Sequence, residues 1–240
     1  MNPIIRQLKA HRTFRDFDPS FTVSDEQLQS ILDATCQAPS SMNGQHYSII
    51  VVDDSEKKQR LAELIPSNAK HIIASSVFLL FVADLRRMHR VCEHYGTEFV
   101  PVGKPEPLLI STIDTALAVE NAVVAVESLG LGSVIVGSIR SVGDKIITMF
   151  NMPEYTLPLL GLSIGKPAVE MRVKPRLPKD TVVHRNAWKE FDYRFIEEYD
   201  GTMEKFAEAR ETKLWSIKFR DYYSQESSPV TRTVLEKQKI

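Results

Sequence analysis

The sequence predicts a layered domain of helices and strands, of α+β or α/β class, and three observations support this prediction. Apolar β-branched runs alternate along the chain with segments of helical periodicity. Residues 108–129 form a long, mostly apolar segment, which is typical of a helix buried within the fold. No internal repeat, low-complexity tract or clear linker divides the chain. We therefore expect one domain over residues 1–240, in which residues of about 180–240 form a C-terminal extension with few core residues of its own.

Local signals predict the individual elements. Ser24 and Gln27 form a capping-box pattern that opens a helix running to about residue 37. Gly96 ends a later helix, and Gly130 and Gly132 follow the end of the long apolar one. The other elements are, in chain order, a strand at 48–53, a charged helix at 55–65, a strand at 77–83, helices at 85–95 and 108–129, a strand at 134–137, a helix at 141–150 and a strand at 157–164.

Charge and cysteine content exclude several classes of protein. The 30 Lys and Arg residues balance 31 Asp and Glu residues, so the net charge of -1 lacks the basic excess of nucleic-acid binders. The two cysteines, Cys36 and Cys92, are too few for a disulfide scaffold. The apolar stretch 72–83 is shorter than the ~20 residues that cross a bilayer, and the N-terminus has no continuous apolar core like that of a signal peptide. We therefore expect a cytoplasmic protein that binds neither nucleic acid nor membrane.

Motifs for catalysis by protein side chains are missing from the sequence. The glycines at 130, 132 and 137 follow a helix and precede a strand, which reverses the order of a dinucleotide-binding turn. His89, Cys92 and His94 do not share one helical face, so we expect no metal site. Neither a Gly-x-Ser-x-Gly nucleophile motif nor a Walker sequence occurs. If the chain is an enzyme, its chemistry therefore belongs to a bound organic cofactor.

Two basic clusters are candidates for binding an anion. Residues 11–15 (His-Arg-Thr-Phe-Arg) combine cationic side chains with a hydroxyl, and residues 174–176 (Lys-Pro-Arg) are held extended by a proline. Either cluster alone is compatible with an exposed charged segment. Together they suit a phosphate and a second anionic centre, because guanidinium groups bind such oxygens in a bidentate manner. Between them, residues 38–45 carry small hydroxyls and amides that can address a heterocycle.

These segments resemble the nitroreductase family of FMN-dependent NAD(P)H oxidoreductases, and in particular the branch of the major oxygen-insensitive nitroreductases and bacterial flavin reductases. Six pieces match in the order of the family and spread over about 170 residues. The matching pieces are HRTFR at 11–15, APSSMNGQ at 38–45, ESLGLG at 127–132, VGSIR at 136–140, LPLLG at 157–161 and KPRLP at 174–178.

The resemblance implies a clamp for the phosphate of non-covalent FMN. His11, Arg12 and Thr13 correspond to contacts with the phosphate and the ribityl chain. Thr13 replaces the usual serine and keeps its hydroxyl. Lys174 and Arg176 correspond to the second half of the clamp.

The resemblance also implies contacts with the flavin ring. Ser40, Ser41 and Asn43 correspond to residues along the ribityl chain and the ring edge. The backbone of residues 136–138 (Val136, Gly137 and Ser138) would lie against the ring, and Ser138 stands where this branch commonly has glycine. Arg15 would lie beside the pyrimidine edge, where its charge supports the negative charge of the reduced flavin. No catalytic acid or base is implied.

Two segments depart from the family pattern. Ala69 stands where many members have glutamine, so either Asn68 supplies the missing amide or one flavin hydrogen bond is lost. The basic loop before Trp215 is shortened, which leaves Arg210 and Lys213 as candidates for binding the 2′-phosphate of NADPH. We expect NADPH as the reductant, with NADH also possible.

The resemblance implies an α+β sandwich, with a central, mostly antiparallel sheet flanked by helices, in an intertwined homodimer that the C-terminal extension wraps. The expected enzyme transfers two electrons from NAD(P)H to nitroaromatics, quinones or similar small-molecule acceptors by a ping-pong scheme. Two alternatives stay open. The chain could be an NAD(P)H:flavin reductase that supplies free reduced flavin, or a flavin-binding redox sensor without useful turnover.

Overall fold

The computed structural model describes residues 2–206, 212–226 and 229–240. The chain divides into two compact units, of which the first comprises residues 1–171 and 228–240 and the second comprises residues 172–227. The helices of the first unit are α1 (Pro3–Lys9), α2 (Asp25–Cys36), α3 (Ser55–Leu64), α4 (Ala69–Ala74), α5 (Arg86–His94), α6 (Pro105–Ser128), α7 (Gly143–Met149) and α10 (Pro229–Lys237). The second unit contains α8 (Arg194–Phe206) and α9 (Trp215–Tyr223).

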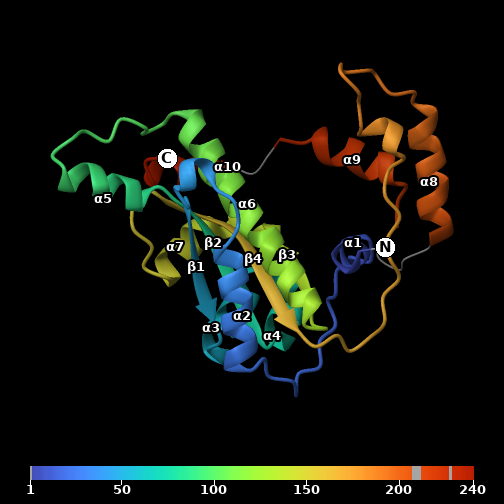
Figure 1. Ribbon diagram of the computed structural model, residues 1–240, viewed down its shortest axis with the longest axis horizontal. Helices are drawn as coiled ribbons and strands as arrows, with labels where there is room; N and C mark the ends of the chain where they lie inside the picture. The colour runs from blue at the N-terminus through green and yellow to red at the C-terminus, as the bar shows by residue number, and fades with distance from the viewer. Residues whose placement is uncertain (1, 207–211, 227–228) are drawn as a thin grey trace. The chain divides into compact units, whose positions relative to one another are not determined.

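A four-stranded sheet forms the centre of the first unit, in the order β1-β2-β4-β3 (Figure 1). The strands are β1 (Tyr47–Val52), β2 (Val77–Asp84), β3 (Gly132–Val136) and β4 (Thr156–Gly165). Each neighbouring pair is antiparallel. The predicted α+β class with an antiparallel sheet is therefore confirmed.

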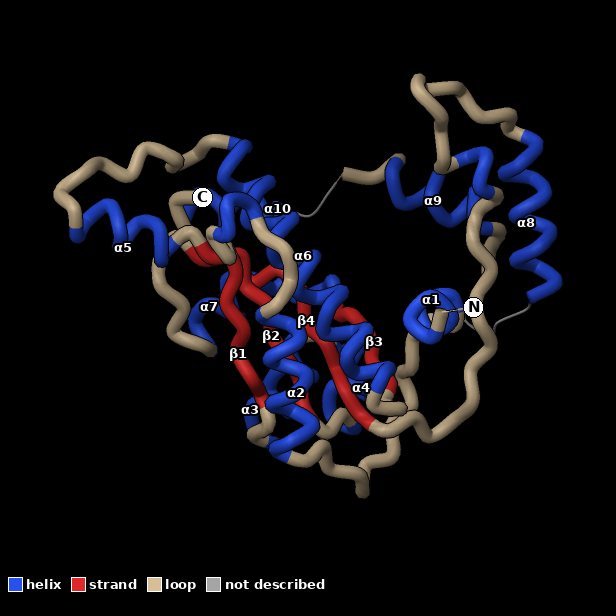
Figure 2. The backbone as a smooth tube through the Cα atoms, viewed as in Figure 1, coloured by secondary structure: helices blue, strands red, loops and turns tan. Residues whose placement is uncertain are grey.

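Helices cover both faces of this sheet, as Figure 2 shows. Alternation along β2 explains the two layers, because successive side chains of a strand point to opposite faces. Leu79 and Phe81 pack in one apolar cluster with residues of α2 and α6, whereas Phe78 and Leu80 pack in another with residues of α3, α4 and α7. All residues of β2 are buried, which accounts for the continuous apolar run in its sequence.

Most predicted elements form close to their expected bounds. The capping box at the start of α2 is present, since the Ser24 hydroxyl accepts from the Gln27 amide and the Gln27 side chain accepts from the Ser24 amide. The expected helix at 141–150 is wrong in its first turn: residues 137–142 form a 3₁₀-helix, η3 (Gly137–Val142), and α7 begins at Gly143. Helix α1 was not expected, although Asn2 caps it and Pro3 opens it.

Helix α6 spans the unit, and one of its faces packs against the sheet. Ala118, Ala122 and Val126 are fully buried there. By length and composition alone, α6 is the one helix among the described residues that could cross a membrane. Core helices of globular domains pass the same test, and the buried face of α6 packs in this way.

Gly161 of β4 is required by the packing of Phe78, because a Cβ atom at position 161 would lie 2.1 Å from Cζ of the Phe78 ring. We predict that Gly161→Ala lowers the free energy of unfolding by about 1–3 kcal/mol, as overpacking does. Gly201→Ala is the matched control, since nothing lies within 4 Å of its Cβ and position 201 is helical. It should raise helix stability by about 0.5–1 kcal/mol. Denaturant unfolding measures the effect of Gly161→Ala, and hydrogen exchange of α8 measures that of Gly201→Ala in the second unit. An unchanged free energy of unfolding in Gly161→Ala would contradict the packing argument.

Candidate functional site

The basic segment 11–15 is held against the outer edge of the sheet. The Phe14 amide donates to the Ser133 carbonyl of β3 at 3.0 Å. The Phe14 ring covers Gly132, where a Cβ atom would lie 2.7 Å from the ring, so the glycine permits this close approach. Phe14 and Phe17 form a small buried cluster with Val134. Apolar side chains thus anchor the segment, and the charged ones between them project from a fixed backbone.

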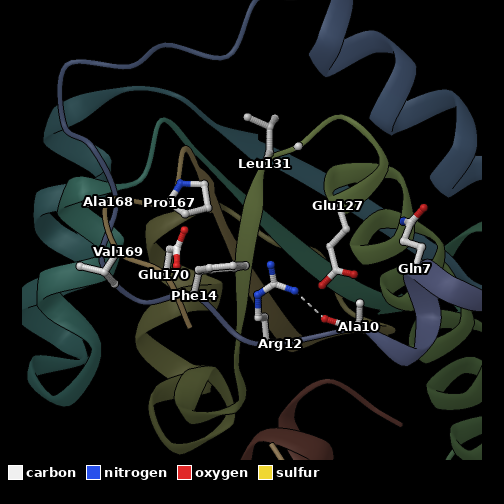
Figure 3. Close-up of a pocket in the computed structure, with 11 residues that line it drawn as sticks. Gln7, Ala10, Arg12, Phe14, Glu127, Leu131, Pro167, Ala168, Val169 and Glu170 are labelled. Atoms are coloured by element: carbon white, nitrogen blue, oxygen red, sulfur yellow. Dashed lines mark hydrogen bonds between the residues drawn. The ribbon is translucent and has the colours of Figure 1, made fainter. Parts of the chain in front are cut away.

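Arg12 projects into a cavity of about 440 Å³ beside this edge, as Figure 3 shows. Its Nη1 donates to the Ala10 carbonyl at 2.7 Å, and its guanidinium lies 5.3 Å from the centre of the Phe14 ring. Its Nε is buried and, among the residues that the structure describes, has no hydrogen-bond partner. A buried N–H group normally has a partner, so this atom indicates a site for an acceptor oxygen.

His11 is paired with a carboxylate on α6. Its Nδ1 lies 2.7 Å from Oε1 of Glu127, whose side chain is 13% exposed. The Glu127 carboxylate therefore fixes the orientation of the His11 ring. Thr13 and Arg15 are half-buried in the same segment.

The polar loop after α2 is held from beneath by a second residue of α6, Asp114. The Asp114 carboxylate accepts from the Ser41 amide at 2.9 Å and from the His46 amide at 3.2 Å. It also lies 2.8 Å from the His46 ring nitrogen Nδ1. Between these anchors Met42 and Asn43 adopt positive φ angles, which non-glycine residues do not readily adopt. The buried carboxylate therefore fixes a strained turn that presents Ser40, Ser41 and Asn43.

Sequence reasoning missed Asp114, His46 and the role of Glu127. One signal could have found Asp114: it is a carboxylate within an apolar helix, and a buried charge requires partners. Glu127 belongs to a segment that the sequence analysis used for its glycines alone. Its pairing with His11 joins residues that are far apart in the chain, which no local pattern indicates.

A third polar group lies at the C-terminal end of β3. The Asn68 side-chain amide donates to the Ser138 hydroxyl at 2.7 Å. Ser138 follows Gly137 at the start of η3, and both are half-buried. The structure therefore brings Asn68 and Ser138 together, two residues that the sequence analysis singled out separately.

The segments held by Asp114 and by Glu127 lie far apart within one chain. From residue 114 to residue 127 helix α6 rises roughly 20 Å, at ~1.5 Å per residue. Strands β1 and β3, which these segments adjoin, are the two edges of the sheet. A single chain therefore does not bring Ser40, Ser41 and Asn43 together with His11 and Arg12.

The remaining predicted residues belong to the second unit. Nη1 of Arg176 donates to the carbonyl of Lys174 at 3.1 Å. Lys213 lies between α8 and α9 and pairs with Asp221 at 2.7 Å. Hydrogen bonds from Lys213 and Arg220 lower the pKa of the Asp221 carboxyl below its usual value. Arg210 lies outside the described residues.

No group of three or more His, Cys, Asp or Glu side chains in the described part of the chain is placed to hold a metal ion. His89 instead stacks on Tyr155, with ring centres 4.2 Å apart. The arrangement thus offers hydrogen-bond donors and cations for an anionic organic ligand.

Family models and known proteins match this chain over most of its length. A family model described as the nitroreductase family matches residues 8–166, and a model of the C-terminal domain of that family matches residues 174–240. The chain is 36% identical to an FMN reductase (NAD(P)H) of Bacillus subtilis, over 99% of this chain and 98% of that protein. It is 33% identical to an oxygen-insensitive NADPH nitroreductase of Salmonella typhimurium, over 99% of this chain and 98% of that protein.

Solved structures agree with these sequence matches. The structure of NfrA2 from B. megaterium superposes with a TM-score of 0.94 at 35% identity, covering 100% of this chain and 98% of that one. The NADPH:FMN oxidoreductase of Vibrio harveyi, solved in complex with NAD+, gives a TM-score of 0.91 at 32% identity, covering 99% and 98%.

The anchoring role of Asp114 leads to a stability prediction. Asp114→Asn removes the negative charge and leaves one of its donors without an acceptor, so we expect the free energy of unfolding to fall by about 1.5–3 kcal/mol. Asp33→Asn is the matched control, because Asp33 is exposed on α2 and accepts one hydrogen bond, from Gln29. It should change stability by less than about 0.5 kcal/mol. Denaturant unfolding measures both variants, and equal effects would show that Asp114 is no anchor.

Proposed function

The chain belongs to the nitroreductase family, and from this membership and the geometry above we propose that it is an FMN-dependent NAD(P)H oxidoreductase. Bound FMN would supply the two-electron chemistry, accepting a hydride from NAD(P)H and reducing a nitroaromatic, a quinone or a similar acceptor in a separate step. The protein's own task is to bind the flavin, orient it and stabilise the charge that it gains.

The buried Nε of Arg12 is the observation that carries this proposal. It is a buried donor without a described partner, on a residue that lines a cavity of about 440 Å³, within the size range of small-molecule pockets. A phosphate oxygen would satisfy it with a charge-assisted hydrogen bond. Two carboxylates that also line the cavity, Glu127 and Glu170, oppose an anion there, and Glu127 is hydrogen-bonded to His11 at 2.7 Å. The unpaired donor of Arg12 is the group there that would hold a flavin phosphate.

We assign the remaining flavin contacts as the family resemblance implies. His11, Arg12 and Thr13 would hold the phosphate, with Lys174 and Arg176 as further candidates. Arg15 would support the negative charge of the reduced ring. The full proposed set, which includes direct contacts and residues that position them, is His11, Arg12, Thr13, Arg15, Ser40, Ser41, Asn43, Asn68, Val136, Gly137, Ser138, Lys174 and Arg176.

A homodimer would resolve the separation of these residues along α6. Leu109, Ile113 and Leu117 are spaced four residues apart on α6 and are 38–56% exposed. Together they make an apolar stripe on the side of α6 that the sheet does not cover. Two α6 helices packed antiparallel along this stripe would place the Asp114 end of one chain beside the Glu127 end of the other. We propose that each flavin site is completed in this way, within one domain of residues 1–240 whose C-terminal part, about 180–240, wraps the dimer.

Lys213 and Arg210 are the candidates for the 2′-phosphate of NADPH. Lys213 would have to exchange its ion pair with Asp221 for one with the phosphate. Any preference for NADPH over NADH should therefore be modest. We place the protein in the cytoplasm, where NADPH is available.

Flavin reduction is a second candidate function, because one similar protein is named an FMN reductase. Comparing a nitrofuran with free FMN as electron acceptors separates the two enzyme activities. Absence of NAD(P)H oxidation by the flavin-loaded protein would favour the redox-sensor alternative instead.

The cofactor assignment has a direct test. The purified protein should bind equimolar FMN, and Arg12→Ala should raise the Kd about ten- to hundredfold, since a hydrogen bond to a charged group contributes about 1.5–3 kcal/mol. Arg6→Ala is the matched control, because Arg6 is exposed on α1 and outside the cavity. Titration of the apoprotein followed by flavin fluorescence measures both. A wild-type protein that takes up no FMN would overturn the function, and equal effects of both variants would overturn the role of Arg12.

The dimer has a separate test. Ile113→Glu places a charge in the apolar stripe and should shift the protein towards monomer in sedimentation velocity, with loss of FMN affinity. Ile73→Glu changes a similarly exposed isoleucine, 49% exposed on α4, and should leave both properties unchanged. A monomeric wild-type protein that still binds FMN would contradict the shared site.

A further inference from the structure

A continuous chain of hydrogen bonds runs from the middle of the sheet to Ser138. The Ser163 hydroxyl on β4 lies 3.1 Å from Nδ1 of His71 on α4. Nε2 of His71 lies 2.9 Å from the side-chain oxygen of Asn68, and the amide nitrogen of Asn68 lies 2.7 Å from the Ser138 hydroxyl. Four elements of the fold thus contribute one side chain each.

The inner half of this chain is shielded from water. Ser163 is 0% exposed and His71 is 4% exposed. Buried polar groups are costly without partners, and these two satisfy one another. Because its inner end is fixed in the packed sheet, the chain can set the orientation of its outer end.

The chemistry of the groups gives the chain a direction. The Asn68 oxygen only accepts, so the Nε2 of His71 that faces it must carry a proton. In the neutral ring Nδ1 is then an acceptor, and it receives the proton of the Ser163 hydroxyl. The amide nitrogen of Asn68 donates to Ser138 and also to the Ser67 hydroxyl, at 3.0 Å. The Ser138 hydroxyl therefore accepts a hydrogen bond from Asn68, and its own proton points to a group outside this chain of hydrogen bonds.

The hydrogen-bonding groups of the Asn68 side chain are therefore used within the protein. Its oxygen and its amide nitrogen are both engaged by side chains of the same chain. It does not need to contact a flavin itself, even though it stands beside the position where the resemblance expects a glutamine. The hydroxyl of Ser138, at a position where the resemblance expects glycine, is the group left to donate outward.

We propose that Asn68 and His71 are positioning residues that orient the Ser138 hydroxyl to donate a hydrogen bond to a carbonyl oxygen of the flavin ring. This inference rests on the proposed function, because it requires FMN beside residues 136–138. Reduction makes the carbonyl oxygens of the flavin ring more negative, so a donor aimed at one of them holds the reduced form more tightly. The network thus favours the reduced flavin, in support of Arg15.

The orientation of the network is testable without any flavin. Nitrogen-15 NMR of the histidine side chains in the apoprotein should show His71 neutral at pH 7, with its proton on Nε2. Asn68→Ala should change the Nε2 signal of His71. A neutral His71 ring with its proton on Nδ1 would reverse the direction of the hydrogen bonds, and a charged ring would remove the acceptor for Ser163. Either result would overturn the inference, whatever ligand the protein binds.

The effect on the flavin is tested by the affinities for oxidised and reduced FMN. Ser138→Ala should weaken the binding of reduced FMN about tenfold more than that of oxidised FMN, which lowers the two-electron potential by about 30 mV. Ser138→Thr keeps a hydroxyl and should retain the potential. Ser67→Ala is the matched control, because it removes the other hydroxyl that Asn68 contacts and should leave the potential unchanged.

A double variant separates a positioning role from a direct one. Asn68→Ala alone should lower the potential, and Asn68→Ala/Ser138→Ala should lower it no further than Ser138→Ala, because the asparagine acts through the serine. Additive effects would mean that Asn68 contacts the flavin itself. If the wild type binds FMN and Ser138→Ala keeps or raises the potential, the inference fails and the proposed function stands. If the wild type binds no FMN, both fail.

Discussion

The packing of α6 against the sheet is the constraint on which the rest of the structure depends. Its inner face fills the core, with Ala118, Ala122 and Val126 fully buried. Because that face is fixed, Asp114 and Glu127 are carried to defined places, where one anchors the loop after α2 and the other pairs with His11. A change in the position of this helix would move both segments together. The helix is therefore both the core of the fold and the frame of the candidate site.

Much of the fold could be predicted from the sequence because its signals are local. The capping box of α2 and the continuous apolar run of β2 follow from short-range chemistry, and the structure confirms both elements. The start of α7 could not be predicted in this way. Residues 137–142 have a pattern compatible with an ordinary helical turn, but they form a 3₁₀ turn that connects β3 to α7. Helix α1 was missed because its seven residues are too few to show a periodic pattern.

The candidate site was predicted through motifs, and its supporting residues could not be. Arg12 and Ser41 lie in segments whose residue types indicate anion and heterocycle binding, and the family resemblance adds Ser138. Asp114 and His71 act on them across long sequence separations, and these contacts exist only in the folded chain. A motif thus names candidate groups for binding a ligand, but not the buried groups that set their orientation.

The cationic side chains of the two candidate phosphate sites have different partners, and this difference predicts tighter phosphate binding at Arg12 than at Lys213. Arg12 is held by a neutral carbonyl and by an aromatic ring, and its Nε has no partner among the described residues that a phosphate would have to displace. Lys213 is already paired with Asp221, which also receives Arg220. Binding a phosphate there exchanges one exposed ion pair for another, and such exchanges contribute little and weaken with salt. A preformed donor in a cavity suits a cofactor that stays bound, whereas an exchangeable surface pair suits a coenzyme that must leave before the electron acceptor can enter.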